Sequence, residues 1–85
     1  MPEENKYATV LFPIRLTKEN IPHLINDTKD VNGLVTIIQD NLVVSAKSLI
    51  GLLNLDFNEV MDMLIQGYVS KEQLNTLKRY EWRKN

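Results

Sequence analysis

Residues 44–53, with the sequence VSAKSLIGLL, restrict the possible fold of this chain more than any other stretch. They are typical of a strand end, a serine cap and a short helix. Ser48 stands just before Leu49, where its hydroxyl can accept a hydrogen bond from the free amides of the first helical turn. The helix, which we expect to end near Asn54, is too short to be stable alone. It must therefore pack against structure formed by the rest of the chain.

The chain has 85 residues, which is enough for one small domain over residues 1–85. Its 44% hydrophobic and 25% charged residues are ordinary for a soluble globular protein. A formal net charge of −1 gives no reason to expect nucleic acid or an anionic membrane as the partner. The absence of cysteine excludes disulfides and thiol catalysis. Residues 1–6 are polar, so we expect a disordered N-terminus rather than a signal peptide, and a cytoplasmic protein.

Four stretches have the pattern of β-strands. Residues 8–16 alternate, with one apolar face, and Pro13 places this strand at a sheet edge because proline cannot donate to a ladder. Residues 34–39 and 42–45 are rich in β-branched side chains, and the Asp40-Asn41 connection between them predicts a tight hairpin. Residues 59–66 form a further strand, in which Met61, Met63 and Ile65 share a face and which we expect Gly67 to end.

Two longer stretches have helical spacing. In residues 17–31 the cap is Thr17 or Asn20, and Pro22 favours Asn20 because proline suits the first turn. We expect Asn32-Gly33 to close this helix in a left-handed turn. Near the C-terminus, Ser70 and Gln73 have the spacing of a capping box. The predicted element order is β-α-β-β-α-β-α, an α+β sandwich with the helices on one sheet face.

The run V-S-A-K-S-L-I-G-L-L resembles the segment around the regulatory serine of the HPr family. HPr is the small phosphocarrier of the bacterial sugar phosphotransferase system, and its catabolite-repression paralogue carries a similar run. The resemblance covers about residues 6–82. It implies an HPr-like open-faced sandwich with a four-stranded antiparallel sheet in the order 1-4-2-3, covered on one face by three helices.

The family's transfer chemistry is missing from this sequence. HPr proteins carry phosphate on a histidine that heads the first helix, within a G-[IL]-H-A-R-P run. The single histidine here, His23, has no glycine before it and no arginine after it, and a helix headed by it would have fewer than two turns before Asn32-Gly33. We therefore expect a degenerate member of the family that is not an enzyme. A working phosphocarrier that uses His23 remains the alternative, and a surface or half-buried helical histidine is the simpler interpretation.

Ser48 and its neighbours are the stronger candidates for a site. Lys47-Ser48 matches the family's K-S motif, so the resemblance implies regulatory phosphorylation at Ser48; the alternative is that Ser48 is an N-cap alone. The same resemblance makes Lys47, Leu49, Ile50 and Leu53 candidates for binding a partner protein. The alternative is that two of the three aliphatic residues Leu49, Ile50 and Leu53 belong to the core, because this helix is apolar on most of its surface.

These observations predict a regulatory or protein-interaction module related to the phosphotransferase system. The partner would be a protein such as a phosphotransferase component or an HPr-type kinase, and the chain would be a monomer or a weak dimer. We expect no cofactor, metal, nucleic acid or membrane among its ligands. A small nucleic-acid-binding module is a further alternative, because Lys78, Arg79, Arg83 and Lys84 lie beside Tyr80 and Trp82 near the C-terminus.

Overall fold

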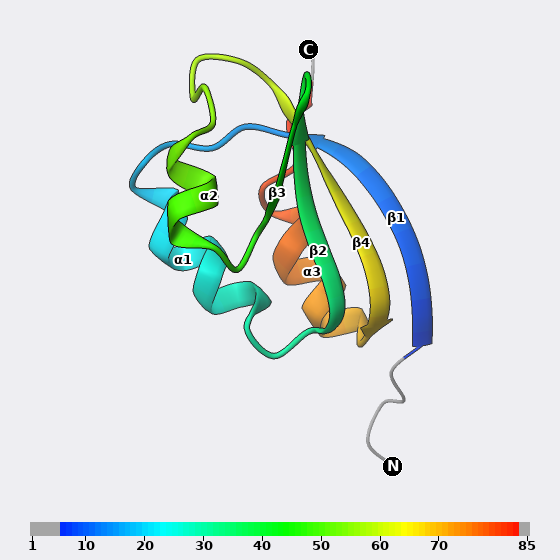
Figure 1. Cartoon of the computed structure of the whole chain (residues 1–85). Coiled ribbons are helices and arrows are strands. Elements are labelled where there is room, and N and C mark those ends of the chain that lie inside the picture. The colour runs from blue at the N-terminus through cyan, green and yellow to red at the C-terminus, as the bar shows by residue number, and fades with distance from the viewer. Residues whose placement is uncertain (1–5, 84–85) are drawn as a thin grey trace.

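A computed structural model describes residues 6–83 of the chain. Seven elements follow one another in the expected order (Figure 1). They are β1 (Lys6–Ile14), α1 (Asn20–Thr28), β2 (Asn32–Gln39), β3 (Leu42–Ser45), α2 (Leu49–Leu53), β4 (Met61–Val69) and α3 (Lys71–Lys78). The predictions for residues 1–5 lie outside the described residues, and Lys6 is the first residue of β1.

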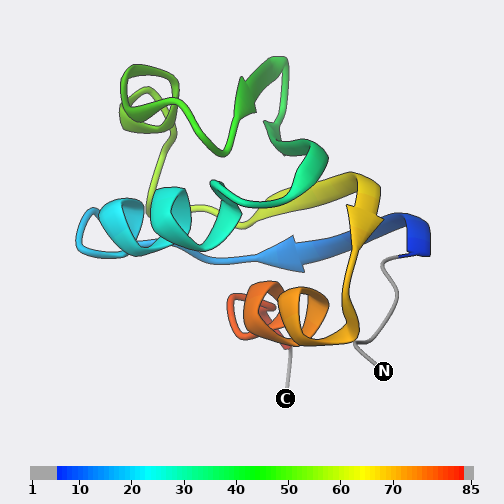
Figure 2. The same ribbon diagram turned by 90° about the horizontal axis from the view of Figure 1, so that it is seen from below.

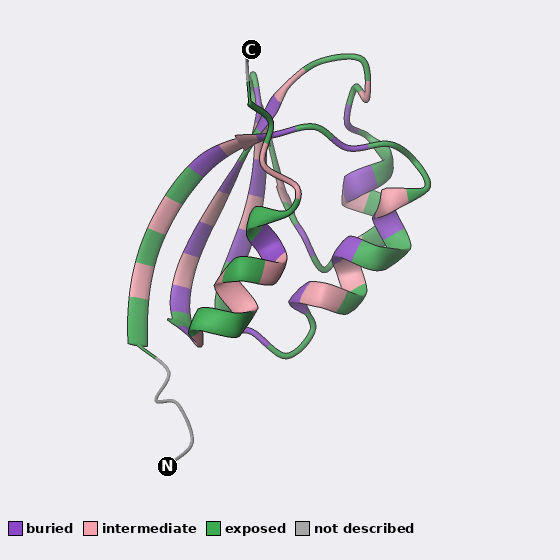
Figure 3. Cartoon of the chain, turned by 180° about the vertical axis from the view of Figure 1, so that it is seen from behind, coloured by how far each residue is buried: buried purple, intermediate pink, exposed green. Residues whose placement is uncertain are grey.

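The four strands form one antiparallel sheet in the order β1-β4-β2-β3. This confirms the predicted α+β class and the strand order. Among the strands of residues 6–83, β1 pairs with β4 alone and β3 with β2 alone, so these two strands are the sheet edges, and Pro13 lies in an edge strand as expected. A single bridge joins Ile14, at the end of β1, to Glu81. Figures 1 and 2 show all three helices on one side of the twisted sheet, and Figure 3 views the molecule from that side.

The core lies between the sheet and the helices. Alternation along β1 and β4 directs one residue in two inward, so Phe12, Ile14, Met63 and Ile65 are buried. The helices supply the other wall, with α1, α2 and α3 each burying at least one leucine. These are Leu24, Leu52 and Leu77. Within residues 6–83, no helix covers the other face of the sheet.

The hairpin follows the sequence prediction closely. Gln39 pairs with Leu42, so Asp40 and Asn41 are the two connecting residues. Asp40 has a φ of 53°, a left-handed conformation that aspartate and asparagine adopt more readily than most residues. The capping box at α3 is also present. Ser70 Oγ accepts from the Gln73 amide at 3.0 Å, and Gln73 Oε1 accepts from the Ser70 amide at 3.0 Å.

The predicted cap of α1 is wrong. Asn20 is the first helical residue, and its side chain is turned back to accept from the Thr17 amide at 2.9 Å and the Thr17 hydroxyl at 3.1 Å. The Asn20 amide also donates to the Thr17 carbonyl at 3.0 Å. Asn20 therefore stabilises the tight turn that leads into the helix rather than the free amides of its first turn.

Two glycine predictions are also wrong. The helix ends at Thr28, with Lys29 as its right-handed C-cap, and Asn32 and Gly33 are the first residues of β2. Gly67 does not end β4, which continues to Val69. The physical reason is common to both residues: Gly33 pairs with Gly67, and the two backbones approach too closely for a side chain at either position.

Candidate protein-interaction site

The connection from β3 to α2 is built around Ser48. This residue has extended backbone angles, φ −105° and ψ 110°, and its Oγ accepts from the Gly51 amide at 3.1 Å. The predicted N-cap is therefore confirmed. At the other end the Asn54 amide donates to carbonyls of the last turn, and its Nδ2 donates to the Ile50 carbonyl at 3.2 Å. A helix of five residues is thus closed by side chains at both ends.

Most of α2 faces water. Leu52 is fully buried, whereas Leu49 and Leu53 are each 52% exposed and Ile50 is 78% exposed. We call Leu49, Ile50 and Leu53 the α2 patch. The interpretation in which two of these three residues belong to the core is therefore wrong, because the helix turns only one side toward β3 and α1.

Gly51 sets how closely this helix lies on the sheet. A side chain added there would bring its Cβ to 3.1 Å from Val44 Cβ and 3.2 Å from Ser48 Oγ. The glycine therefore lets α2 rest directly on β3, and it keeps the Ser48 hydroxyl within reach of the amide that it caps. The opposite side of the helix, which carries the α2 patch, is left outward.

The side chain of Lys47 forms a hydrogen bond within the protein. Its Nζ donates to the Val31 carbonyl at 3.0 Å, in the connection between α1 and β2. The Lys47 amide donates to Ser45 Oγ at 3.1 Å, which forms a small serine turn just before the helix. Lys47 thus links the loop before α2 to the connection between α1 and β2, although the residue as a whole is exposed.

His23 lies elsewhere, as the fourth residue of α1 and with an exposed side chain. It lines a pocket of about 280 Å³ together with Asn20, Asp27, Arg79 and Tyr80. None of residues 47–53 lines this pocket. No arginine follows His23 in the sequence, but the fold brings Arg79, at the C-terminal end of α3, into the same pocket. Sequence reasoning missed this grouping because no local signal links residues on the first and last helices.

Tyr80 and Asp27, which both line this pocket, are joined by a hydrogen bond. The Tyr80 hydroxyl donates to Asp27 Oδ2 at 2.6 Å. Burial of the ring raises the pKa of Tyr80 well above its ordinary value, and the hydrogen bond and negative charge of Asp27 raise it further, against a smaller opposing effect of Arg79. The carboxylate of Asp27 is therefore engaged in joining α1 to the C-terminal segment.

The C-terminal basic residues are partly matched by acidic and aromatic groups. Glu81 lies 4.0 Å from Lys78 Nζ and 3.4 Å from an Arg83 guanidinium nitrogen, and Lys78 Nζ also lies 5.4 Å from the centre of the Phe12 ring. The Trp82 amide donates to the Pro13 carbonyl at 2.8 Å, so this segment runs along the end of β1. Lys84 lies outside the described residues.

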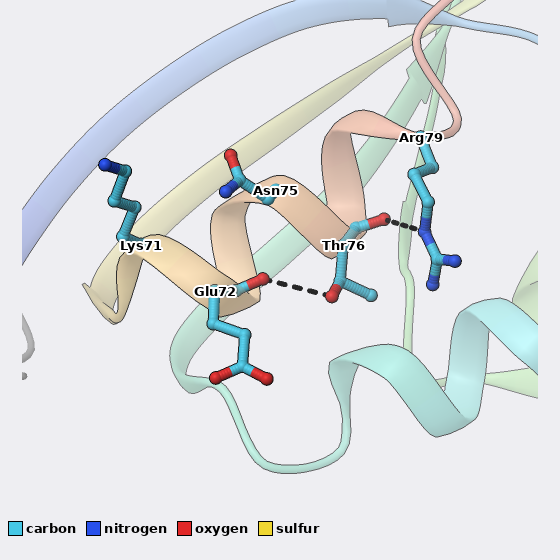
Figure 4. A pocket seen from close by; sticks show the side chains of 5 residues that line it. All are labelled: Lys71, Glu72, Asn75, Thr76 and Arg79. Carbon is cyan, nitrogen blue, oxygen red and sulfur yellow. Dashed lines mark hydrogen bonds between the residues drawn. The ribbon is translucent and has the colours of Figure 1, made fainter.

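A depression of about 350 Å³ on α3 is lined by Lys71, Glu72, Asn75, Thr76 and Arg79 (Figure 4). Two of its polar side chains donate hydrogen bonds to carbonyl groups of the same helix. The Thr76 hydroxyl donates to the Glu72 carbonyl at 3.0 Å, and Arg79 Nε donates to the Thr76 carbonyl at 3.4 Å. The side chains in Figure 4 spread along the helix rather than pointing at a common centre, so they do not form a binding site in this depression.

The fold and site together define a small α+β protein with an open antiparallel sheet and an exposed aliphatic patch on its shortest helix. No family model matches the chain, and comparison with curated proteins and with solved structures finds no match. Over residues 6–83, none of the helices has the length and apolar character needed to span a bilayer. The same residues hold no group of three or more acidic or histidine side chains that could bind a metal ion.

Proposed function

We propose that this protein is a non-catalytic, HPr-like module of the bacterial cytoplasm that binds a protein partner through the α2 patch. One observation carries the proposal: three of the five residues of α2 are aliphatic and exposed, next to one another on the same helix. Exposed aliphatic side chains that are gathered on one element are typical of interaction surfaces. The capped ends, and the close approach of α2 to Val44 that Gly51 allows, favour a formed helix before any partner binds, which lowers the entropy cost of binding.

The HPr-like part of the proposal rests on two features. The first is the run of residues 44–53, and the second is the β1-β4-β2-β3 strand order that the resemblance implies. The comparisons with known proteins do not identify a family, so an experiment with family partners is needed. An HPr-type kinase is the appropriate first partner, because it would have to recognise the Lys47-Ser48 pair.

Phosphorylation of Ser48 would regulate the same surface. The Ser48 oxygen would attack the γ-phosphorus of ATP in the kinase, and the hydroxyl proton would pass to a base of that enzyme as ADP leaves. The phosphoserine would add a charge of nearly −2 beside Leu49 and Ile50. Burying these residues against a partner would then require desolvation of the phosphate or a cationic partner group, so binding would depend on the state of Ser48.

Binding can be tested by titrating the ¹⁵N-labelled protein with an HPr-type kinase and following the amide signals. We expect shifts over residues 47–53, with Ile50→Glu reducing the affinity at least roughly 10-fold by placing a charge in the contact. Asn75→Glu, which adds the same charge to an exposed residue of α3 away from both apolar surfaces, is the control. Shifts confined to other surfaces, or equal binding by the Ile50→Glu variant, would contradict the proposal.

Phosphorylation of Ser48 is tested in a separate experiment. Incubation with an HPr-type kinase and ATP should add the mass of one phosphoryl group, and peptide mapping should place it at Ser48. Ser48→Ala should abolish the mass gain, whereas Ser45→Ala should keep it. A protein that gains no mass would remove Ser48 regulation but would leave binding through the α2 patch to the titration.

The pocket at His23 supports a second candidate function, that of a phosphocarrier. Arg79 lines the pocket with His23 and could pair with a phosphoryl group, as guanidinium groups do in phosphate sites. Asp27 lies in the same pocket and would oppose that charge. Incubation with enzyme I and phosphoenolpyruvate distinguishes the two candidates: an acid-labile phosphoryl group on His23 would show phosphocarrier activity, and its absence would leave only the interaction module.

A further inference from the structure

The sheet face opposite the helices is a second apolar surface, separate from the α2 patch. Alternation along the strands places on it one residue in two from each of the four strands. We call this surface the open face. It consists of Tyr7, Thr9, Leu11, Pro13, Asn32, Leu34, Thr36, Ile38, Val43, Ser45, Asp62, Leu64, Gln66 and Tyr68.

The strand register orders these side chains into rows across the sheet. One row runs Leu11, Leu64, Thr36 and Ser45, and the next toward one end runs Pro13, Asp62, Ile38 and Val43. At the other end Tyr7 and Tyr68 lie opposite each other, with their rings edge to face and 5.2 Å between centroids. The row between these runs Thr9, Gln66 and Leu34, so apolar side chains occur in every row and polar ones lie among them.

The exposed area of this face is close to one half of a standard protein interface. Leu34 and Val43 are each 65% exposed, and Tyr7 and Leu11 are each 60% exposed. With Tyr68, these side chains expose roughly 600 Å², and a stable interface buries about 800 Å² per partner. The largest apolar patch on a typical monomer covers about 300–600 Å² and often has a function, so the open face lies at the upper end of that range.

The small number of charged residues on the open face indicates which kind of partner it can bind. Among the described residues of the open face, Asp62 alone carries a charge. A face with no lysine or arginine gains nothing from an anionic membrane surface, and it offers no ion pairs to a strongly charged protein. A second copy of this face has the same apolar composition, and two sheets can pack face to face about 10 Å apart.

The position of Asp62 also selects the orientation of two copies. Asp62 lies in the row at one end of the face, and Tyr7 and Tyr68 lie in the row at the other end. Copies with parallel strands would bring the two Asp62 rows together, and like charges would meet. Copies with antiparallel strands would bring Asp62 of each protomer to the tyrosine row of its partner, where a phenol can donate to the carboxylate.

We propose that the protein forms a twofold symmetric dimer in which two open faces pack together with antiparallel strands. The dimer interface is then isologous, because each protomer contributes the same residues. It leaves the α2 patch free, since α2 lies on the helix side of the sheet. This inference does not rest on the proposed function, and either could fail while the other holds.

Sedimentation equilibrium of the full chain, from about 1 µM to about 500 µM, measures the dimer directly. We expect a concentration-dependent shift from the mass of one chain to that of two. Leu34→Glu and Val43→Glu should each raise the dissociation constant at least roughly 100-fold, because the symmetry places two buried charges in every dimer. Ile50→Glu, on the α2 patch, should dimerise like the wild type. Circular dichroism confirms that each variant is folded.

A wild-type chain that sediments as a monomer over the whole range would overturn the dimer. So would folded Leu34→Glu and Val43→Glu variants that dimerise with the wild-type constant, or an Ile50→Glu variant that does not dimerise. The orientation is tested separately by Asp62→Asn and Tyr68→Phe. Each should weaken the dimer by about 3-fold to 10-fold through the loss of a charge-assisted hydrogen bond. Unchanged or tighter association of both would exclude the antiparallel arrangement.

Discussion

Gly33 of β2 and Gly67 of β4 lie opposite each other in the sheet, and each occupies the space that a side chain at the other would need. A Cβ atom at Gly67 would come within 2.5 Å of the Asn32 carbonyl oxygen and 2.7 Å of Gly33 Cα. A Cβ atom at Gly33 would lie 2.4 Å from Gly67 Cα, and its φ of 153° is one that other residues rarely adopt. The centre of the sheet therefore depends on this pair.

We expect Gly67→Ala to lower the free energy of unfolding by about 2–3 kcal/mol, because the backbones of β2 and β4 must separate to admit the methyl group. Urea denaturation followed by circular dichroism measures the loss. Gln66→Ala, one residue earlier in the same strand and on the open face, should cost less than about 1 kcal/mol. Equal stabilities of Gly67→Ala and the wild type would show that the two strands are less closely apposed than described.

The glycine pair also shows where sequence patterns fail. The hairpin and the β1 edge could be predicted because period-two alternation, Pro13 and Asp40-Asn41 are local signals. Gly33 and Gly67 were interpreted as the ends of elements, which is their commonest use. Their true role depends on a pairing between residues 34 positions apart. No local rule gives that pairing, although a glycine within a strand pattern can indicate close backbone approach.

The candidate site, too, could be predicted from the sequence only in part. The Ser48 cap follows from its place before an apolar run, and it could be predicted from residues 48–51 alone. The exposure of the α2 patch could not, because an all-apolar helix gives no period that separates an inner side from an outer one. The contact between Tyr80 and Asp27 joins residues 53 positions apart and required the fold.

The Tyr80 hydroxyl stabilises the folded state through its bond to Asp27, and this has a pH dependence. The pKa of Tyr80 is raised in the folded state, so its contribution is complete below the unfolded tyrosine pKa of about 10 and is lost as the pH rises above that value. Tyr80→Phe should cost about 1 kcal/mol at neutral pH and should make the loss of stability above about pH 10 less steep.

Urea denaturation at neutral pH and again above about pH 10 measures both effects of Tyr80→Phe. Tyr7→Phe is the control at neutral pH, because its ring is exposed on the open face and its stability should stay within about 0.5 kcal/mol of the wild type. A Tyr80→Phe variant whose stability falls with alkaline pH as steeply as that of the wild type would contradict the hydrogen bond to Asp27.

Gln39 holds the loop before β4 through two hydrogen bonds to one residue. Its Nε2 donates to the Asp56 carbonyl at 2.8 Å, and its Oε1 accepts from the Asp56 amide at 2.7 Å. Gln39→Leu should lower the free energy of unfolding by about 2–3 kcal/mol, because a half-buried amide and carbonyl lose their partners. Gln39→Glu keeps an acceptor for the Asp56 amide but places a buried carboxylate oxygen against the Asp56 carbonyl, so at neutral pH it should be less stable than the wild type and no more stable than Gln39→Leu. Urea denaturation of the three proteins gives this order, and any other order would argue against the paired bonds.

The Ser48 cap should be measurable without any kinase. Ser48→Ala removes the acceptor for the Gly51 amide and should cost about 1 kcal/mol, whereas Ser48→Asp keeps a capping oxygen and should stay within about 0.5 kcal/mol of the wild type. Thermal unfolding followed by circular dichroism measures both variants. If Ser48→Asp were as unstable as Ser48→Ala, a negative charge at this position would disturb α2 itself, and an effect of phosphorylation on binding could no longer be assigned to the α2 patch alone.

Leu52 and Ile50 lie two residues apart on α2, but Leu52 lies in the core and Ile50 is exposed to water. Substitution of Ile50 is therefore a control for substitution of Leu52. Leu52 is fully buried, and Leu52→Ala should lower the free energy of unfolding by about 2–4 kcal/mol through lost contacts and a cavity. Ile50→Ala should change stability by less than about 1 kcal/mol, because its side chain is 78% exposed. Urea denaturation of both variants tests which side of α2 belongs to the core. A large loss at Ile50 would mean that the α2 patch is structural, and the surface proposed to bind a partner would then not be free.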